Sequence, residues 1–181
     1  MLGKALYIVQ TDRWYTERAV WGIAGGTLLI STALATFAHP LAVLLVAAVG
    51  TFSILDALTG FCVVSTLLLQ LGIPSRLTGP GPTPRWLGRP VYRMQTDRWF
   101  LERAIYVVVG VNLILATVLV LAHSVWWLLF PAFVGAASLA FAKTGFCPVA
   151  NVLYQLGFEP RLGRDLPVRE AMTAPIASLP S

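Results

Sequence analysis

The chain has 181 residues, of which 57% are hydrophobic and only 12% are charged, and its formal net charge is +5. A mean hydropathy of +0.75 is too apolar for a water-soluble domain of this length, so we expect the lipid bilayer to be its solvent. The positive charge does not indicate nucleic-acid binding, because the basic residues flank apolar stretches and form no continuous run.

The first predicted element is a helix that begins in the segment QTDRWYTER, residues 10–18. Thr11 suits a helix N-cap, and Asp12 would then lie near the positive end of the helix dipole. Arg13 and Glu17 are four residues apart, as are Arg98 and Glu102 later in the chain, so each pair can form along one helix face. Trp14 would lie at headgroup depth, where indole rings are favoured.

The following segments predict a helical hairpin. Residues 19–38 form an uncharged stretch of 20 residues, long enough to cross roughly 30 Å of hydrocarbon. After a turn at His39 and Pro40, residues 41–55 are apolar again and predict the return helix. Asp56 and the turn TGFC at residues 59–62 follow. The next apolar stretch, residues 61–71, has about 11 residues, which is typical of an interfacial or re-entrant segment rather than a span.

The second half of the chain repeats the first. Residues 7–77 align with residues 92–162 without a gap, and about 30 of the 71 aligned pairs are identical, which indicates a tandem duplication. TGFC recurs at residues 144–147, so the only two cysteines, Cys62 and Cys147, are equivalent. The repeat predicts further spans over residues 104–122 and 125–142, and a shorter apolar helix over residues 146–156.

The chain is expected to divide into four parts. Residues 1–77 form the first repeat, residues 78–91 a linker rich in Pro and Gly, residues 92–162 the second repeat and residues 163–181 a tail. The tail has little apolar periodicity, so we expect it to be ordered only where a partner holds it.

Charge placement decides how many spans each repeat has. With two spans per repeat, the basic residues of the N-terminal segment, the linker and the tail all fall on one side, whereas the other two turns carry no Lys or Arg. Three spans per repeat would divide these residues between both sides, against the positive-inside rule. We therefore predict an all-α integral membrane protein with four transmembrane helices. They form two parallel two-span repeats, each followed by a short interfacial helix.

The same rule predicts a multi-pass protein of the bacterial inner membrane, with both termini and the linker cytoplasmic. The tripeptide ALA at residues 33–35 resembles a signal-peptide cleavage site. Cleavage is not expected, because the charged segment before it has mixed sign and the same pattern recurs inside the chain.

Small residues indicate where helices could touch. Gly22 and Gly26 form a GxxxG motif in the first span, and Ala132, Ala136 and Ala140 form a row of small residues in the fourth. Such rows allow close approach of two helix backbones, so we expect both to lie in helix contacts.

Two kinds of charged site are considered. Asp56 and Lys143 each place one charge near the end of a return helix, and we hypothesise that they form an ion pair across the repeats; the alternative is that each reaches the headgroups separately. The paired arginines of the two helix starts could contact anionic lipid headgroups, or could simply form a structural collar where the helices enter the membrane. These arginines are Arg13, Arg18, Arg98 and Arg103.

The cysteines carry two interpretations. Cys62 and Cys147 could be small apolar residues packed at a tight bend, or reactive thiols that accept sulfur, which would need a lowered pKa. Cys147 has Lys143 one turn before it, whereas Cys62 has Asp56 nearby, which opposes thiolate formation. Two cysteines without a nearby histidine do not indicate a zinc site, so we expect no metal and no cofactor.

The segment AFVGAASLAFAKTGFCPVANVLYQLG, residues 132–157, resembles the YgaP-like transmembrane domain, a two-span family with a TGFCP turn and a closing LG. The acid–arginine pairs at residues 17–18 and 102–103 also match, although the first repeat has Val63 in place of the proline. The resemblance covers about residues 12–73 and 97–158. It implies that a tandem copy forms, within one chain, the four-helix unit that single-copy relatives form as dimers. Some relatives anchor a rhodanese sulfurtransferase, but no cysteine here lies in a soluble catalytic loop.

No set of residues in the sequence indicates an enzyme. We therefore predict a non-catalytic membrane protein, an accessory or structural subunit that packs against other subunits of a larger respiratory or photosynthetic complex in the bilayer. The alternatives are membrane sulfur handling through Cys62 and Cys147, as a sulfur carrier or a passage for a small sulfur anion, and a small-solute transporter.

Overall fold

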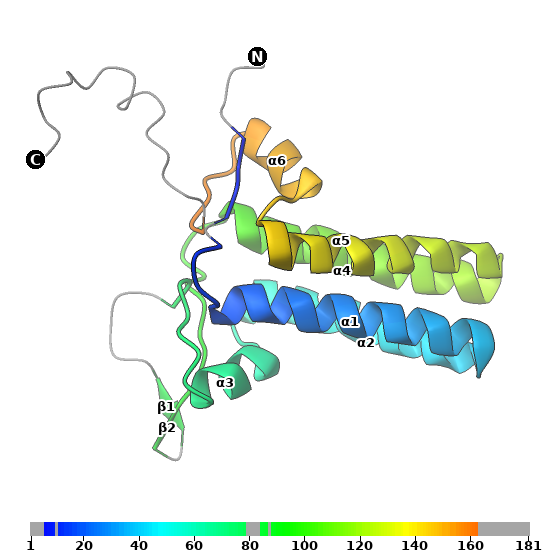
Figure 1. Ribbon diagram of the computed structural model, residues 1–181, viewed down its shortest axis with the longest axis horizontal. Coiled ribbons are helices and arrows are strands. Elements are labelled where there is room, and N and C mark those ends of the chain that lie inside the picture. The colour runs from blue at the N-terminus through cyan, green and yellow to red at the C-terminus, as the bar shows by residue number, and fades with distance from the viewer. Residues whose placement is uncertain (1–5, 10, 79–83, 87, 163–181) are drawn as a thin grey trace, which may run out of the picture.

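Four long helices dominate the computed structural model, which describes residues 6–9, 11–78, 84–86 and 88–162 (Figure 1). They are α1 (Thr16–Phe37), α2 (Leu44–Thr59), α4 (Leu101–Ala122) and α5 (Leu129–Thr144). A 3-10 turn precedes each return helix, Pro40–Val43 before α2 and Val125–Leu128 before α5. The four resulting segments are long and apolar enough to cross a membrane. The chain is an all-α membrane protein with the four spans that the sequence predicts. The predicted tail, residues 163–181, lies outside the described residues.

Two short helices follow the return helices. They are α3 (Val63–Gln70) and α6 (Pro148–Gln155), each of 8 residues. A helix of this length extends only about 12 Å, too little to cross the hydrocarbon. The linker also contains a small antiparallel hairpin of two strands, β1 (Arg85–Trp86) and β2 (Arg89–Pro90).

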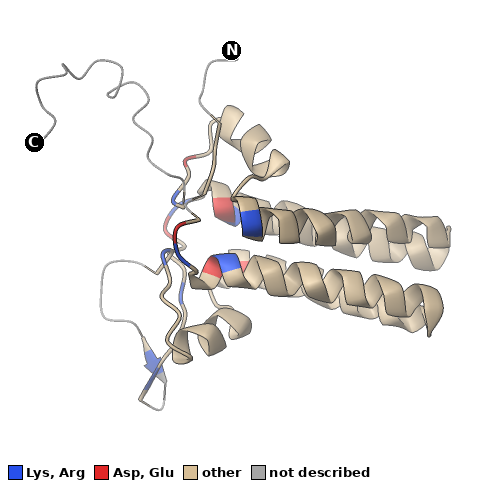
Figure 2. Cartoon of the chain, viewed as in Figure 1, with Lys and Arg blue, Asp and Glu red and all other residues tan. Residues whose placement is uncertain are grey.

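The acidic and basic residues gather at one end of the bundle (Figure 2). This charged end holds the starts of α1 and α4, the ends of α2 and α5, and the segments that join them to α3 and α6. At the opposite end, the turn end, α1 leads into α2 and α4 leads into α5. The long helices carry no charged residue between the two ends, as a bilayer interior requires.

The long helices pair across the repeats. α1 packs along α5, and α2 packs along α4, whereas the two helices of one repeat contact each other much less (Figure 1). Because one helix of each pair leaves the charged end and the other returns to it, both pairs are antiparallel. Each repeat is therefore completed by the other.

Glycines allow the closest approach in both pairs. A Cβ atom on Gly25 of α1 would lie 2.7 Å from the carbonyl oxygen of Gly135 in α5. A Cβ atom on Gly50 of α2 would lie 2.8 Å from the carbonyl oxygen of Gly110 in α4. Gly25 is equivalent to Gly110, and Gly50 to Gly135. The α1–α5 and α2–α4 contacts are therefore built in the same way.

The predicted rows of small residues are largely wrong. Ala136 and Ala140 are exposed and face away from the other helices. A Cβ atom on Gly22 would approach α5 to 3.7 Å, but one on Gly26 would have no neighbour within 4 Å. The contact centres on Gly25, one position before the end of the predicted motif, because spacing alone does not say which face of an apolar helix meets a partner.

The segment before each span is extended rather than helical. α1 begins at Thr16, and its N-cap residue Tyr15 makes no capping hydrogen bond through its side chain. The predicted cap at Thr11 is therefore wrong. The amide of Val9 instead donates to the carbonyl oxygen of Gly145 (3.0 Å), in the TGFC turn of the other repeat.

The glycines of the two TGFC turns are required by their backbone. Gly60 and Gly145 have φ of 71° and 72°, in the left-handed region that residues with a side chain disfavour. The amide of Met94 donates to the carbonyl oxygen of Gly60 (2.8 Å), as Val9 does to that of Gly145. A Cβ atom on Gly60 would also collide with the carbonyl oxygen of Met94, and one on Gly145 with that of Val9.

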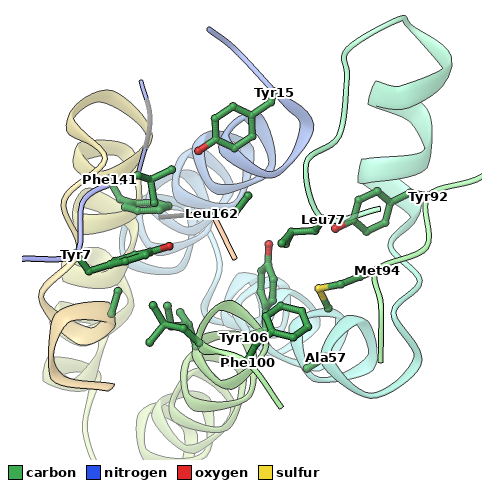
Figure 3. Close-up of a cluster of buried hydrophobic side chains, with 14 residues drawn as sticks. Tyr7, Tyr15, Ala57, Leu77, Tyr92, Met94, Phe100, Tyr106, Phe141 and Leu162 are labelled. Atoms are coloured by element: carbon green, nitrogen blue, oxygen red, sulfur yellow. The ribbon is translucent and has the colours of Figure 1, made fainter. Parts of the chain in front are cut away.

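The largest buried cluster lies at the charged end, where side chains from both repeats meet (Figure 3). Among its members are Tyr7, Tyr15, Tyr92, Phe100, Tyr106 and Leu162. The segments that precede α1 and α4, here called the arms (residues 6–9 and 91–94), contribute to this cluster. The starts of α1 and α4 and the segments after α3 and α6 also contribute. This cluster fixes how the two repeats meet.

The contrast between two adjacent glycines tests the crossing of α1 and α5. Gly25→Ala places a methyl group against the backbone of α5, and we expect it to lower the free energy of unfolding by about 1–3 kcal/mol. Gly26→Ala is the matched control, since its methyl group has open space, and it should be neutral or stabilising by up to about 1 kcal/mol. Unfolding in detergent micelles measures both values. Equal effects of the two substitutions would contradict the crossing.

Candidate functional site

The carboxylate of Glu17, at the start of α1, is a buried centre of hydrogen bonds. The residue is 1% exposed. Its Oε1 accepts from the Ser75 hydroxyl (2.5 Å) and from the amide of Leu77 (2.9 Å), and both its oxygens accept from the amide of Arg76 (3.1 and 3.2 Å). Such donors compensate the cost of burying a carboxylate. Glu17 therefore fixes the segment that follows α3.

Glu102 has the same role in the second repeat. It accepts from the amides of Arg161 (3.0 Å) and Leu162 (2.7 Å). Its third donor comes from the first repeat, because the Tyr7 hydroxyl donates to Oε1 at 2.8 Å. Glu102 thus ties the N-terminal arm of the first repeat to the second.

The arginines that follow these glutamates bind helix ends of the opposite repeat. The Nε of Arg18 donates to the carbonyl oxygen of Ala142 in α5, and that of Arg103 to Ala57 in α2, both at 2.5 Å. Carbonyls in the last turn of a helix have no partner within it. Both guanidinium groups also donate to carbonyls of the extended segment before their own helix, for example Arg18 to Thr11 at 3.0 Å.

Two predictions for these residues are corrected. Glu17 and Glu102 do not pair with Arg13 and Arg98, since their oxygens accept from other groups. Arg18, like its counterpart in α4, is buried with its donors directed at backbone carbonyls, as expected for a structural collar and not for a lipid contact. Arg13 and Arg98 are exposed and stay candidates for anionic headgroups.

Cation–π contacts and ion pairs connect side chains at the surface of the charged end. Arg76 lies over the ring of Tyr15 (4.8 Å) and pairs with Asp12 (3.5 Å). In the second repeat Arg161 pairs with Asp97 at 3.4 Å. Each of these exposed ion pairs typically adds less than about 1 kcal/mol to stability. The buried glutamates and arginines therefore contribute most of the polar stabilisation of the charged end.

Asp56 and Lys143 do not form the predicted ion pair. Asp12–Arg76 and Asp97–Arg161 are the two ion pairs within 4.0 Å in the described part of the chain. Asp56 is 3% exposed, whereas Lys143 is exposed. The physical reason is the cross-repeat pairing: α2 packs against α4, and α5 packs against α1, so the two return helices that carry these charges are not packed together.

Asp56 instead lines a cavity of about 640 Å³ between α1 and α2. Apolar side chains of both helices form its walls, and Tyr106 of α4 and Ser138 of α5 also contribute. One carboxylate oxygen of Asp56, Oδ1, is buried and has no hydrogen-bond partner among the described residues. A buried acceptor without a partner is uncommon in folded proteins.

The sequence did not predict this cavity, although a comparison of the repeats carries a signal. The first repeat has Ala24 and Asp56 where the second has Val109 and Phe141. Ala48 of the first repeat likewise corresponds to a phenylalanine. These three positions of the first repeat all line the cavity.

The thiols are the N-cap residues of α3 and α6. Cys62 and Cys147 are free and half-buried, so they form no disulfide. Burial raises the pKa of both thiols, and the nearby carboxylate of Asp56 further raises the pKa of Cys62. A helix N-terminus favours a thiolate, but here its contribution does not outweigh burial.

No metal-binding group of three His, Cys, Asp or Glu side chains occurs within the described ranges. His39 and His123 lie at the turn end, where their Nδ1 atoms accept from the Leu41 amide and the Trp127 indole, both at 3.2 Å.

No protein-family model, curated protein or solved structure matches this chain.

The rate of thiol alkylation tests the environment of the cysteines. The thiolate is the reactive form, so a raised pKa means that Cys62 and Cys147 react with iodoacetamide more slowly at pH 8 than the free thiol of a cysteine in an unstructured peptide, with rates still rising above pH 9. Asp56→Asn should accelerate Cys62 and leave Cys147, the internal control, unchanged. Rates equal to the free thiol at pH 8 would refute this assignment.

Proposed function

We propose that the chain is a non-catalytic membrane subunit that packs against other membrane proteins in a larger complex. The main support for this proposal is that the buried charged side chains of the charged end form their hydrogen bonds within the chain itself. Glu17, Glu102, Arg18 and Arg103 are all engaged in holding the chain to itself. A reactive site needs groups that are free to meet a substrate, and this collar supplies none.

The thiol environment weighs against sulfur handling. Both cysteines have a raised pKa, so at neutral pH each is mainly the unreactive thiol. A sulfur carrier would require the opposite shift. Cys62 and Cys147 are better explained as small residues that fit a bend at the start of α3 and α6.

The bundle interior weighs against solute transport. The buried hydroxyls of Ser31, Thr117 and Ser138 each donate to a carbonyl four residues earlier in their own helix. Hydroxyls bonded in this way present no continuous polar path through the hydrocarbon region of the described chain.

The outer surface offers groups that a partner subunit could contact. Large aromatic side chains project from the bundle, including Phe37 (88% exposed) and Trp126 (76% exposed) near the turn end. Arg13 and Arg98 project from the charged end. Aromatic residues and arginine are enriched at protein interfaces.

We also propose that each repeat is a YgaP-like transmembrane domain, and that the protein lies in a bacterial inner membrane with its charged end cytoplasmic. The TGFC turn that both repeats share supports this family assignment. Its glycine has a structural role, because its carbonyl oxygen accepts a hydrogen bond from the segment before the first span of the other repeat. The gathering of basic residues at one end supports the orientation (Figure 2).

Native purification tests the subunit proposal. The tagged full chain, extracted from its own membranes in a mild detergent, should migrate on a native gel with a larger assembly whose other subunits are present in fixed ratio. A tagged four-helix membrane protein of unrelated sequence, expressed at the same level, controls for incidental association. A protein that migrates alone as a homogeneous single chain would contradict the proposal.

A further inference from the structure

The cavity between α1 and α2 results from the way the repeats pair. Because α1 packs along α5 and α2 packs along α4, the two helices of the first repeat are held by other partners and leave a gap between them. The volume of about 640 Å³ lies within the range of small-molecule sites, roughly 300–1,000 Å³. Its position between two spans opens it to molecules dissolved in the bilayer.

At some cavity-lining positions, Asp56 and Ala24 among them, the first repeat carries a polar or smaller residue than the second. Phe141 is buried at the position equivalent to Asp56, and its ring is nearly perpendicular to that of Trp21, with centroids 5.6 Å apart. Val109 likewise stands at the position equivalent to Ala24.

Aromatic rings form part of the cavity wall. Trp21 and Tyr106 both line it and are stacked on each other, with ring centroids 5.2 Å apart and planes inclined by 9°. Phe52 and Phe61 add further rings from α2 and the following turn. Such walls favour a planar ring, because offset stacking and edge contacts add to the energy of apolar burial.

Asp56 places one hydrogen-bonding group in this apolar setting. The residue is 3% exposed, lines the cavity, and leaves Oδ1 without a partner in the described part of the chain. Burying an acceptor without a partner is unfavourable, because the water it loses is not replaced. A carboxyl group can donate to a carbonyl when protonated and accept from a hydroxyl when ionised.

We propose that this cavity binds a lipid-soluble ring compound of the quinone class, with its ring among the aromatic side chains and a carbonyl or hydroxyl oxygen bonded to Asp56. A phospholipid acyl chain would fill the apolar volume but would leave Oδ1 of Asp56 without a partner. The site is distinct from the collar of buried glutamates and arginines and does not depend on the subunit proposal.

Quenching of tryptophan fluorescence by decylubiquinone tests the proposal. The full chain in nanodiscs of phosphatidylcholine should show a saturable component, which disappears in Trp21→Tyr because Trp21 lines the cavity. Ala24→Val combined with Ala48→Phe introduces the residues of the second repeat and should abolish that component. Asp56→Leu should weaken binding about tenfold, the effect of one lost hydrogen bond of about 1.4 kcal/mol. Asp56→Asn, which keeps a donor and an acceptor, should retain most of the affinity.

Lys143→Leu is the matched control, since it removes the other charge at the end of a return helix but lies outside the cavity lining, and it should bind like the unmodified chain. Three outcomes would overturn the proposal. Quenching that rises linearly without saturation would show that the cavity holds at most acyl chains. Saturable quenching that survives the Ala24→Val/Ala48→Phe change would place the quinone elsewhere. Unchanged affinity in Asp56→Leu would remove the carboxyl from the site.

Discussion

The guanidinium groups of Arg18 and Arg103 determine how the chain can be assembled. Each begins a span in one repeat and donates to a last-turn carbonyl of the return helix in the other. In a bilayer, the donors of a buried arginine and the free carbonyls of a helix end both need partners from the protein, because no water is available deeper in the membrane. The preceding glutamates hold the segments after α3 and α6 at the same place. Neither repeat alone can satisfy the arginines and the helix-end carbonyls, so the two fold around each other.

The contacts between the repeats explain why most structural features occur twice, and also why a cavity can form beside Asp56. The collar, the crossing arms and the glycine contacts recur in both repeats, because each depends on groups that the duplication preserved. The gap between helices of one repeat is a consequence of pairing across repeats, and side chains are free to fill it or leave it open. Phe141 packs against Trp21 of the other repeat, whereas its counterpart Asp56 lines a cavity and keeps one oxygen without a partner among the described residues.

The sequence was sufficient to predict the duplication, the four spans and the break at each TGFC turn, because these depend on identity, hydropathy and glycine. It did not predict which helices pair. In a soluble protein the apolar face of a helix marks its partner, but a transmembrane helix is apolar all round. For this reason Gly25 was missed in favour of Gly22 and Gly26, and Asp56 was paired with Lys143. The role of Arg18 was also missed, since no sequence pattern indicates which distant carbonyls a buried arginine will meet.

A disulfide cross-link tests the cross-repeat pairing most directly. A Cβ atom on Gly22 would lie 3.7 Å from that of Ala142, within the range of about 3.5–4.5 Å found in disulfides. In a Cys62→Ala/Cys147→Ala background with a protease site in residues 79–83, Gly22→Cys with Ala142→Cys should oxidise within one chain. The two halves should then stay joined after proteolysis until a reductant is added. Gly26→Cys with Ala142→Cys is the control, and its halves should separate. Separation of the halves in the Gly22→Cys pair, or a disulfide formed only between two chains, would contradict the pairing of α1 with α5.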